Sequence, residues 1–200
     1  MNIFKFNLEK QEEINQAVEK SIKILNKGGT IVHPTDTCYG IAADMKNEMA
    51  VKKVYKLKGR DFNNPLFIIL LNIIQFKKYG HWNLLIKKMI KKNPNKMFTF
   101  VVPRKKIVPE YLNPNFDTIG IQMPKCLFSQ ALLKKFKSPV IGTSANVFNQ
   151  PVVYSTEDLL IQLKKVGRYP DLILDVGRIP IKKPSSVIKV EGEKIKILRK

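Results

Sequence analysis

Apolar residues recur at two different spacings along this chain, and the two spacings alternate. In several stretches they lie three or four residues apart, which indicates helices with one buried face. The first stretch is followed by Gly28-Gly29, a pair that ends helices, and the last is opened by Ser155 with two acids in its first turn. This spacing predicts helices over residues 14–25, 50–57, 84–90, 128–136 and 159–163.

Short apolar runs between these stretches predict strands. Glu191-Gly192-Glu193 has the composition of a hairpin turn between the last two runs. The strands are too numerous, and some connections too short, for a purely parallel sheet, so we expect a twisted mixed sheet flanked by helices, of the α/β (α+β) class. The predicted strands cover residues 30–33, 66–71, 97–102, 118–123, 139–141, 172–174, 187–190 and 194–198.

Length and hydropathy set the organisation of the chain. Its 200 residues correspond to one domain, residues 1–200, and an apolar content of 44% suffices for a proper core. No run of about 18 apolar residues occurs, so we expect no membrane span and a cytoplasmic location.

The net charge of +20 has two explanations at this stage. Clustered basic residues collect phosphate charge, which favours an RNA-binding face. However, 31 of the 36 basic residues are Lys, beside many Ile and Asn, as expected from a genome that favours A- and T-rich codons. Charge alone therefore leaves both explanations open, while each of the five Arg residues becomes a candidate for a specific task.

Several kinds of site are excluded by the motifs that are missing. The chain has no phosphate-binding Gly-x-x-x-x-Gly-Lys-Ser/Thr loop and no Gly-x-Gly-x-x-Gly. Cys38 and Cys126 have no partner at metal-ligand spacing, so we expect two reduced thiols and no metal site in the protein itself. His33 is expected to be a packing residue.

Three small polar clusters remain as candidate chemistry. Lys58-Gly59-Arg60 follows a predicted helix, and two cations separated by a glycine can clamp neighbouring phosphates. Ser144-Ala145-Asn146 follows a buried strand. Thr35-Asp36-Thr37 lies at a strand end, where Asp36 can hold Mg²⁺ or an amine. Taken singly, each cluster is equally compatible with a solvated surface run or a self-capped turn.

The order of these clusters resembles the YrdC-like family, also called TsaC. The motifs are Pro-Thr-Asp-Thr-x-Tyr-Gly, Lys-x-Arg followed by Asn-Pro-Leu, Ser-Ala-Asn, Pro-Ser-Ser-Val and Ile-Leu-Arg. The resemblance spans residues 10–199 and has the length of the short, single-domain form. It implies a mixed sheet around a deep, positively charged groove.

The resemblance also implies an activity. The family are L-threonylcarbamoyladenylate synthases, which form threonylcarbamoyl-AMP and pyrophosphate from L-threonine, bicarbonate and ATP with Mg²⁺. Downstream threonylcarbamoyl-transfer proteins then modify tRNA, which the basic groove would also contact. The resemblance places Lys58, Arg60, Ser144 and Asn146 at the phosphates as catalytic groups; Asn64, Thr118 and Arg199 beside ATP; and Thr35, Thr37, Gln122 and Ser185 at threonine.

Three residues depart from the family pattern, and the mildest departure is Ile69, where the longer relatives often have a His. Gln122 stands where many relatives have an Arg that would pair with the threonine carboxylate, and a neutral partner could weaken binding by roughly 1.5 to 3 kcal/mol. Lys125 is the candidate to compensate. Asp61 stands where Pro is usual, and an acid there can pair with Arg60. A threonine site lost at Gln122 would leave the alternative function, a non-catalytic RNA-binding protein on the same fold.

Overall fold

The computed structural model describes residues 1–199, which form ten strands and six helices. Every predicted helix is present, with each end within three residues of its expected position. Three elements were not expected from the sequence: two strands and one short helix. The helices are α1 (Gln11–Asn26), α2 (Glu48–Lys58), α3 (Ile73–Tyr79), α4 (Leu84–Lys92), α5 (Leu127–Phe136) and α6 (Thr156–Val166).

All ten strands belong to one mixed sheet, which confirms the expected fold class. Their spatial order is β1-β8-β2-β3-β7-β4-β6-β5-β9-β10, with four parallel and five antiparallel pairings. The strands are β1 (Asn2–Lys5), β2 (Thr30–Pro34), β3 (Tyr39–Asp44), β4 (Phe67–Ile69), β5 (Phe98–Pro103), β6 (Thr118–Gln122), β7 (Val140–Ser144), β8 (Leu172–Asp175), β9 (Ser186–Glu191) and β10 (Lys194–Arg199).

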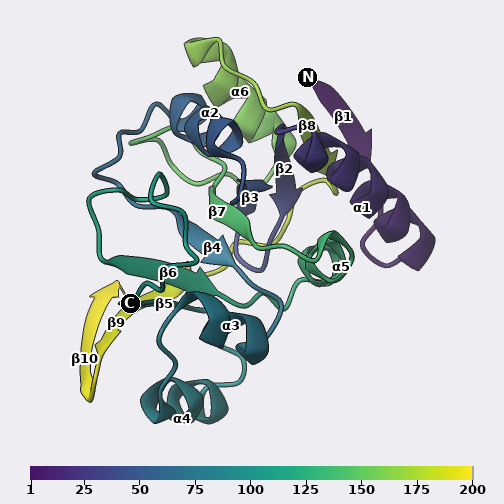
Figure 1. The fold of residues 1–200 in the computed structure, drawn as a ribbon. Coiled ribbons are helices and arrows are strands. Elements are labelled where there is room, and N and C mark those ends of the chain that lie inside the picture. Colours follow the sequence, from purple (N-terminus) through teal and green to yellow (C-terminus); the bar gives the residue numbers. More distant parts are fainter. Residues whose placement is uncertain (200) are drawn as a thin grey trace.

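Helices cover both faces of the sheet (Figure 1). On one face α1 and α5 lie side by side, and their apolar side chains pack on Ile31 of β2 and Ala42 of β3. On the other face α2 and α6 pack on the next residues along the same strands, Val32 and Ile41. Successive side chains of a strand point to opposite faces, so β2 and β3 are buried on both sides.

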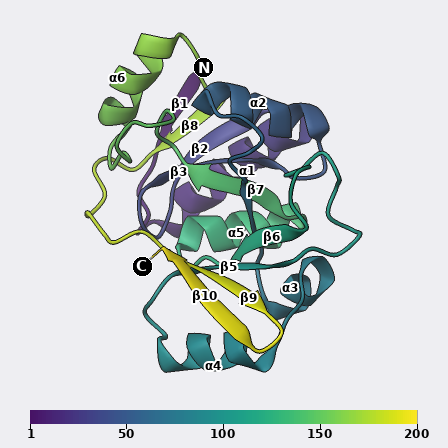
Figure 2. The same cartoon turned by 90° about the vertical axis from the view of Figure 1, so that its left-hand side faces the viewer.

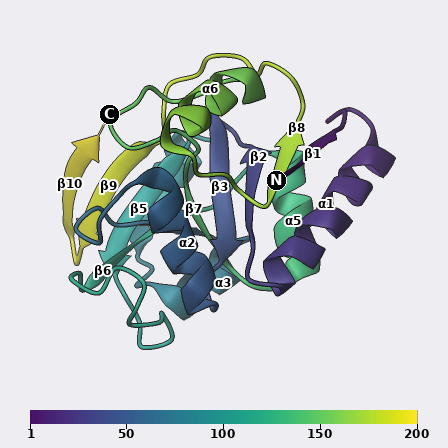
Figure 3. The same ribbon diagram turned by 90° about the horizontal axis from the view of Figure 1, so that it is seen from above.

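The β6-β5-β9 part of the sheet is covered by helices on one face only. Phe100 of β5, Ile121 of β6 and Ile188 of β9 pack in the core that also holds residues of α3 and α4. The alternate residues of these strands point to the opposite face, where no helix lies over them. Figure 3 shows β9 and β10 at the side of the molecule opposite α1, where the sheet curves around this open face.

The hairpin β9–β10 extends the sheet past α4 (Figure 2). Asn83, which caps α4 through its side-chain oxygen, donates from Nδ2 to the Gly192 carbonyl of the hairpin turn at 2.7 Å. Gly192 has φ 56, a left-handed conformation that a two-residue turn requires. The bond joins the turn of the hairpin to the start of α4.

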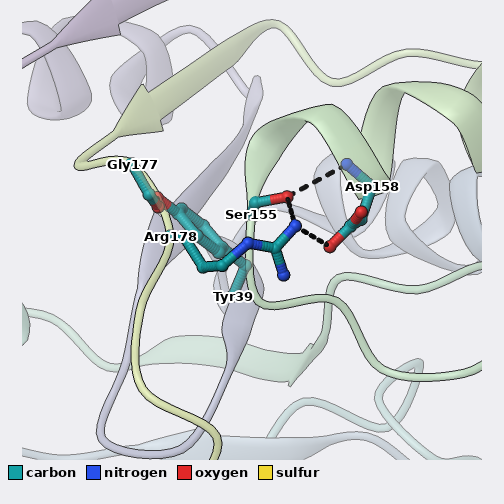
Figure 4. Close-up of polar contacts among 5 residues, drawn as sticks. All are labelled: Tyr39, Ser155, Asp158, Gly177 and Arg178. Carbon is teal, nitrogen blue, oxygen red and sulfur yellow. Dashed lines mark hydrogen bonds and ion pairs between the residues drawn. The ribbon is translucent and has the colours of Figure 1, made fainter.

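The loop after β8 is anchored to the start of α6 and to Tyr39 (Figure 4). Arg178 donates to Ser155 Oγ at 3.3 Å and pairs with Asp158 at 3.1 Å. Ser155 caps α6 by accepting from the Asp158 backbone at 3.2 Å, as its sequence position predicted. Tyr39 is fully buried, and its hydroxyl donates to the Gly177 carbonyl at 2.7 Å. Within residues 1–199 no helix is long and apolar enough to cross a membrane.

Candidate functional site

A cavity of about 510 Å³ lies over the open face of the sheet. Its floor is made by the outward-facing residues of β4, β6, β5 and β9, such as Phe67, Gly120, Val101 and Val187. Its walls come from strand ends and loops far apart in sequence. Eight of the eleven residues that the sequence nominated line it: Thr35, Thr37, Arg60, Thr118, Gln122, Ser144, Ser185 and Arg199.

Arg60 reaches the cavity because α2 ends sharply at Gly59. Gly59 has φ 65, and the amide groups of Gly59 and Arg60 donate back to the carbonyls of Lys56 and Tyr55. A Cβ on Gly59 would lie 2.9 Å from Nη1 at the flexible end of Arg168, which can move, so it is the backbone conformation that favours glycine here. Beyond the turn, Arg60 donates to Thr143 Oγ1 at 3.4 Å and to the Pro65 carbonyl at 3.3 Å.

Lys58 is held behind the loop that follows β7. Its Nζ donates to the carbonyl oxygens of Ser144 at 2.6 Å and Asn146 at 2.7 Å, and it lies 3.4 Å from Asn146 Oδ1. Ser144 Oγ donates to the same Oδ1. Lys58 and Asn146 therefore do not line the cavity. They support Ser144, which does.

Burial changes the protonation of this cluster. Lys58 is 3% exposed, and burial, together with the nearby Arg60 charge, lowers the pKa of its ammonium to about 7. Burial also lowers the pKa of the Arg60 guanidinium, and its Nε is buried without a hydrogen-bond partner among residues 1–199. Two desolvated cations that lack an acidic partner are suited to an anion that arrives from solution.

The Thr35–Cys38 turn forms the opposite wall. Thr35 Oγ1 donates to the Cys38 carbonyl at 2.6 Å and accepts from the amides of Thr37 and Cys38. Its hydroxyl is thus used to build the turn. Asp36 accepts from the Lys125 amide at 3.1 Å, and burial raises the pKa of its carboxyl. Thr37 has only a weak contact, 3.9 Å from Cys38 Sγ, so its hydroxyl remains available to a ligand.

Arg199 and Ser185 connect the chain end to the floor. Arg199 donates to the Ser185 carbonyl at 3.0 and 3.2 Å and to Ser185 Oγ at 3.2 Å. Ser185 Oγ lies 2.9 Å from Thr99 Oγ1. Thr99 is the register partner of Gln122 in the antiparallel β5–β6 pair. A single polar row therefore leads from Arg199 to Gln122.

Three expectations about neighbouring residues turn out differently. Asn64 does not line the cavity; its Nδ2 donates to Asp61 Oδ1 at 2.8 Å. Asp61 makes that bond and one to the Asn63 amide, and no ion pair with Arg60 occurs within residues 1–199. Lys125 does not line the cavity either, because its ammonium donates to the Pro94 carbonyl. It therefore does not compensate for the neutral Gln122 in this structure.

Polar residues that the motifs did not single out also line the cavity. Thr99 and Ser129 are isolated polar residues within apolar stretches, and Thr143 precedes Ser144 on β7. Period-two alternation on β5 and β9 is the signal that places Thr99 and Lys189 on the open face. Among the lining residues the charged ones are Asp36, Arg60, Lys189 and Arg199, an excess of cations that favours an anionic ligand.

The side chains that line the cavity include few potential metal ligands. Asp36 is the one carboxylate among the lining residues, and residues 1–199 contain no group of three His, Cys, Asp or Glu side chains that could hold a metal ion. Mg²⁺ commonly uses one carboxylate and completes its shell with water and substrate phosphates. A Mg²⁺ ion in this cavity would take most of its ligands from water and from a bound phosphate, with Asp36 as the one carboxylate available to it.

Known proteins are similar to this chain both in sequence and in fold. A family model described as "Telomere recombination", for Sua5, YciO and YrdC, matches residues 23–200. A putative threonylcarbamoyl-AMP synthase of Methanocaldococcus jannaschii is 32% identical over 200 residues, which is 100% of this chain and 91% of that protein. The threonylcarbamoyl-AMP synthase of Buchnera aphidicola is 29% identical over 86% of this chain and 98% of that protein.

A solved structure, Pyrococcus abyssi Sua5 complexed with L-threonine, superimposes with a TM-score of 0.86 at 25% identity. The match covers 100% of this chain and 57% of that one, so this chain spans a little over half of the archaeal protein. The open-faced mixed sheet carries a cation-lined cavity that is suited to an anionic ligand. The chain belongs to the Sua5/YciO/YrdC family.

Proposed function

We propose that the protein is an L-threonylcarbamoyladenylate synthase, a nucleotidyltransferase that joins L-threonine, bicarbonate and ATP into threonylcarbamoyl-AMP and pyrophosphate. Two relatives that are named threonylcarbamoyl-AMP synthase, one of them as putative, align with 100% and 86% of this chain. The observation that carries the proposal is the single cavity that brings Arg60, Ser144 and Arg199 together with Thr37 and Gln122. It offers cations to a polyphosphate and neutral donors to an amino acid.

The reaction needs two anions to meet. The threonine amine and bicarbonate form a carbamate with loss of water, and a carbamate oxygen then bonds to the α-phosphorus while the bond to pyrophosphate breaks. Positioning and charge neutralisation supply most of the rate for such phosphorus chemistry. Arg60, and Lys58 behind it, neutralise the phosphates, while Ser144 and Asn146 orient them.

The remaining residues are assigned by their place in the cavity. Thr118 and Arg199 lie on the nucleotide side, and Thr35, Thr37, Gln122 and Ser185 on the threonine side, where Thr35 acts by shaping the turn. Asn64 would reach ATP only if it left Asp61. Lys58 and Asn146 act from behind the cavity wall, through their hydrogen bonds to Ser144 and to each other.

The wider setting is part of the proposal. Residues 1–200 act as a single domain. ATP is bound with Mg²⁺, which screens the charge of the phosphates. The product then passes to threonylcarbamoyl-transfer proteins that modify tRNA in the cytoplasm. The direct test is mass-spectrometric detection of threonylcarbamoyl-AMP after incubation with all three substrates. Its absence with folded protein would leave an RNA-binding protein as the alternative.

RNA contact is favoured by the charge of residues 62–109, called here the α3–α4 segment. All sixteen Asp and Glu residues lie outside it, and it contains nine exposed Lys. On α4, Lys87 faces Lys91 and Lys88 faces Lys92 at i,i+4 spacing, which costs about 0.2–0.5 kcal/mol per pair. None of the ion pairs within residues 1–199 offsets this repulsion. Codon bias raises Lys but does not explain a local lack of acids.

The test compares two sets of four Lys→Gln changes. One set is on α4, at residues 87, 88, 91 and 92; the control set is Lys20, Lys23, Lys27 and Lys46, which are also exposed. The α4 set should weaken tRNA binding and lower the slope of log affinity against log salt by about 0.9 for each lost phosphate contact. Equal slopes for the two sets would rule out this surface.

A further inference from the structure

Asn113 is a buried polar residue in the loop between β5 and β6. It is 0% exposed and is not among the residues that line the cavity. Its Oδ1 accepts from the Leu66 amide at 2.8 Å, and its Nδ2 donates to the Leu66 carbonyl at 2.7 Å. The side-chain amide thus bonds both backbone groups of one residue, as a neighbouring strand does. It holds the chain in place directly before β4.

Tyr55 of α2 is bonded to the same oxygen. Its hydroxyl donates to Asn113 Oδ1 at 3.0 Å. Burial raises the pKa of Tyr55 to about 12, so the hydroxyl keeps its proton near pH 7. Arg60 lies between Tyr55 and Leu66 in the sequence. Asn113 therefore ties together both ends of the segment that carries Arg60.

The orientation of Arg60 depends on this segment. Its Nη2 donates to the carbonyl of Pro65, the residue directly before Leu66, at 3.3 Å, and its Nη1 donates to Thr143 Oγ1 at 3.4 Å. Within residues 1–199 no carboxylate forms an ion pair with the guanidinium. A shift of Leu66 would move the Pro65 carbonyl and loosen one of the two bonds that direct Arg60.

Arg104 fixes the loop that presents Asn113. Its Nη1 donates to the carbonyls of Leu112 at 3.0 Å and of Asn113 at 3.3 Å, and its Nη2 donates to the Pro109 carbonyl at 2.6 Å. Asn113 itself has φ 54, a left-handed conformation that asparagine and glycine adopt more readily than other residues. The side-chain amide is therefore presented to Leu66 from a backbone that is itself held.

We infer that Asn113 is a positioning residue for ATP, which fixes Tyr55 and Leu66 so that the Arg60 guanidinium is already directed at the phosphates when the nucleotide arrives. A cation that is held in place beforehand loses less conformational freedom on binding, which strengthens the complex. The inference rests on the proposed function, because it names what orients one of the phosphate-binding groups of that site.

Calorimetric binding of ATP with Mg²⁺ tests the inference without turnover. Asn113→Gly keeps the left-handed backbone and removes the side chain, and it should weaken ATP binding by about 10- to 100-fold but leave threonine binding unchanged. In an Arg60→Ala background the same change should weaken ATP binding by less than about 2-fold, because its effect passes through Arg60. The matched control is Asn149→Gly, since Asn149 also has a positive φ, 61, but is exposed. It should bind ATP as the wild type does.

Unchanged ATP binding by folded Asn113→Gly protein, or equal losses with and without Arg60, would overturn the inference. Tyr55→Phe removes one bond to Asn113 and covers the case in which Asn113→Gly does not fold. It should weaken ATP binding by a smaller factor, and unchanged binding would overturn the inference too.

A wild-type measurement needs no variant. The side-chain amide protons of Asn113 should exchange with solvent much more slowly than those of the exposed Asn149, and equal exchange rates would overturn the inference. Absence of threonine-dependent pyrophosphate release, with the expected pattern of ATP binding intact, would count against the proposed function alone. Threonine-dependent release without that pattern would count against the inference alone.

Discussion

The ammonium nitrogen of Lys58 lies 2.6 Å from the carbonyl oxygen of Ser144, which is 86 residues further along the chain. The bond joins the end of α2 to the end of β7, and so unites two motifs that are weak when considered separately. It also removes Lys58 from the cavity surface and buries it without a carboxylate. The predictions about phosphate chemistry follow from this arrangement.

Lys58→Ala should lower kcat/KM for ATP by about 100-fold or more, because it removes a buried positive charge beside the phosphates. Steady-state pyrophosphate release measures the change. The matched control is Lys52→Ala on the same helix, where the ammonium pairs with Glu48 and is half exposed. Similar losses in both variants would show that the effect is general to the helix.

Nucleotide binding should be accompanied by proton uptake at pH 8. The pKa of Lys58 is lowered from 10.5 to about 7 in the folded protein, so between these values the unfolded chain holds more protons. This group therefore makes the free energy of unfolding rise with pH across that window. A bound triphosphate favours the charged ammonium and raises its pKa again.

Calorimetric titration with ATP in two buffers of different ionisation enthalpy measures this proton uptake. Lys58→Met, which has no titrating group, should bind ATP with a heat that no longer depends on the buffer. A buffer-independent heat in the wild-type protein would contradict the assignment.

Gln122→Arg should lower the KM for threonine about 10-fold or more. The new guanidinium would face the cavity beside Thr99 and offer a charged partner to the threonine carboxylate, worth about 1.5–3 kcal/mol. Gln150→Arg adds the same charge on the exposed surface and should have no effect. An unchanged KM in Gln122→Arg would show that the side chain at residue 122 does not contact the threonine carboxylate.

Tyr39→Phe should lower the free energy of unfolding by about 1–3 kcal/mol, because the Val176 amide and the Gly177 carbonyl would lose their buried partner. Figure 4 shows the Tyr39 ring directed at this loop. Urea denaturation measures the change, and Tyr169→Phe, at a residue that is 47% exposed, is the control. Equal urea midpoints for Tyr39→Phe and Tyr169→Phe would show that water replaces the Tyr39 hydroxyl with no loss of stability.

Most elements could be predicted because their apolar spacing is strong. The unexpected strand β3 reads Tyr-Gly-Ile-Ala-Ala-Asp, and glycine and alanine are poor strand formers. It is a strand because it pairs with β2 on one side and β7 on the other. Helix α3 begins with two isoleucines, which favour a strand, but Asn72 caps it by accepting from the Gln75 amide at 3.0 Å. The pairing of β3 is a contact that local patterns do not contain. The Asn72 cap is local, but the two isoleucines that follow it favour a strand and hide the helix.

The residues of the candidate site also fall into two groups, those that the sequence could predict and those that it could not. Motifs at element ends, such as Arg60 after Gly59, could be found because chain geometry and chemistry coincide there. Thr99, Ser129 and His33 could not, because a single polar residue in an apolar stretch gives no sign of which cavity it meets. Their common location depends on how β2, β5 and α5 pack together.

Pyrophosphate release from ATP by the purified protein, with threonine and bicarbonate supplied or withheld, tests the central claim most directly. Release should require both compounds and ATP, and serine should support it less well than threonine, because serine leaves the methyl-sized space in the cavity empty. Release that is independent of threonine, or no release from folded protein with all three substrates, would contradict the assignment of a threonylcarbamoyl-AMP synthase.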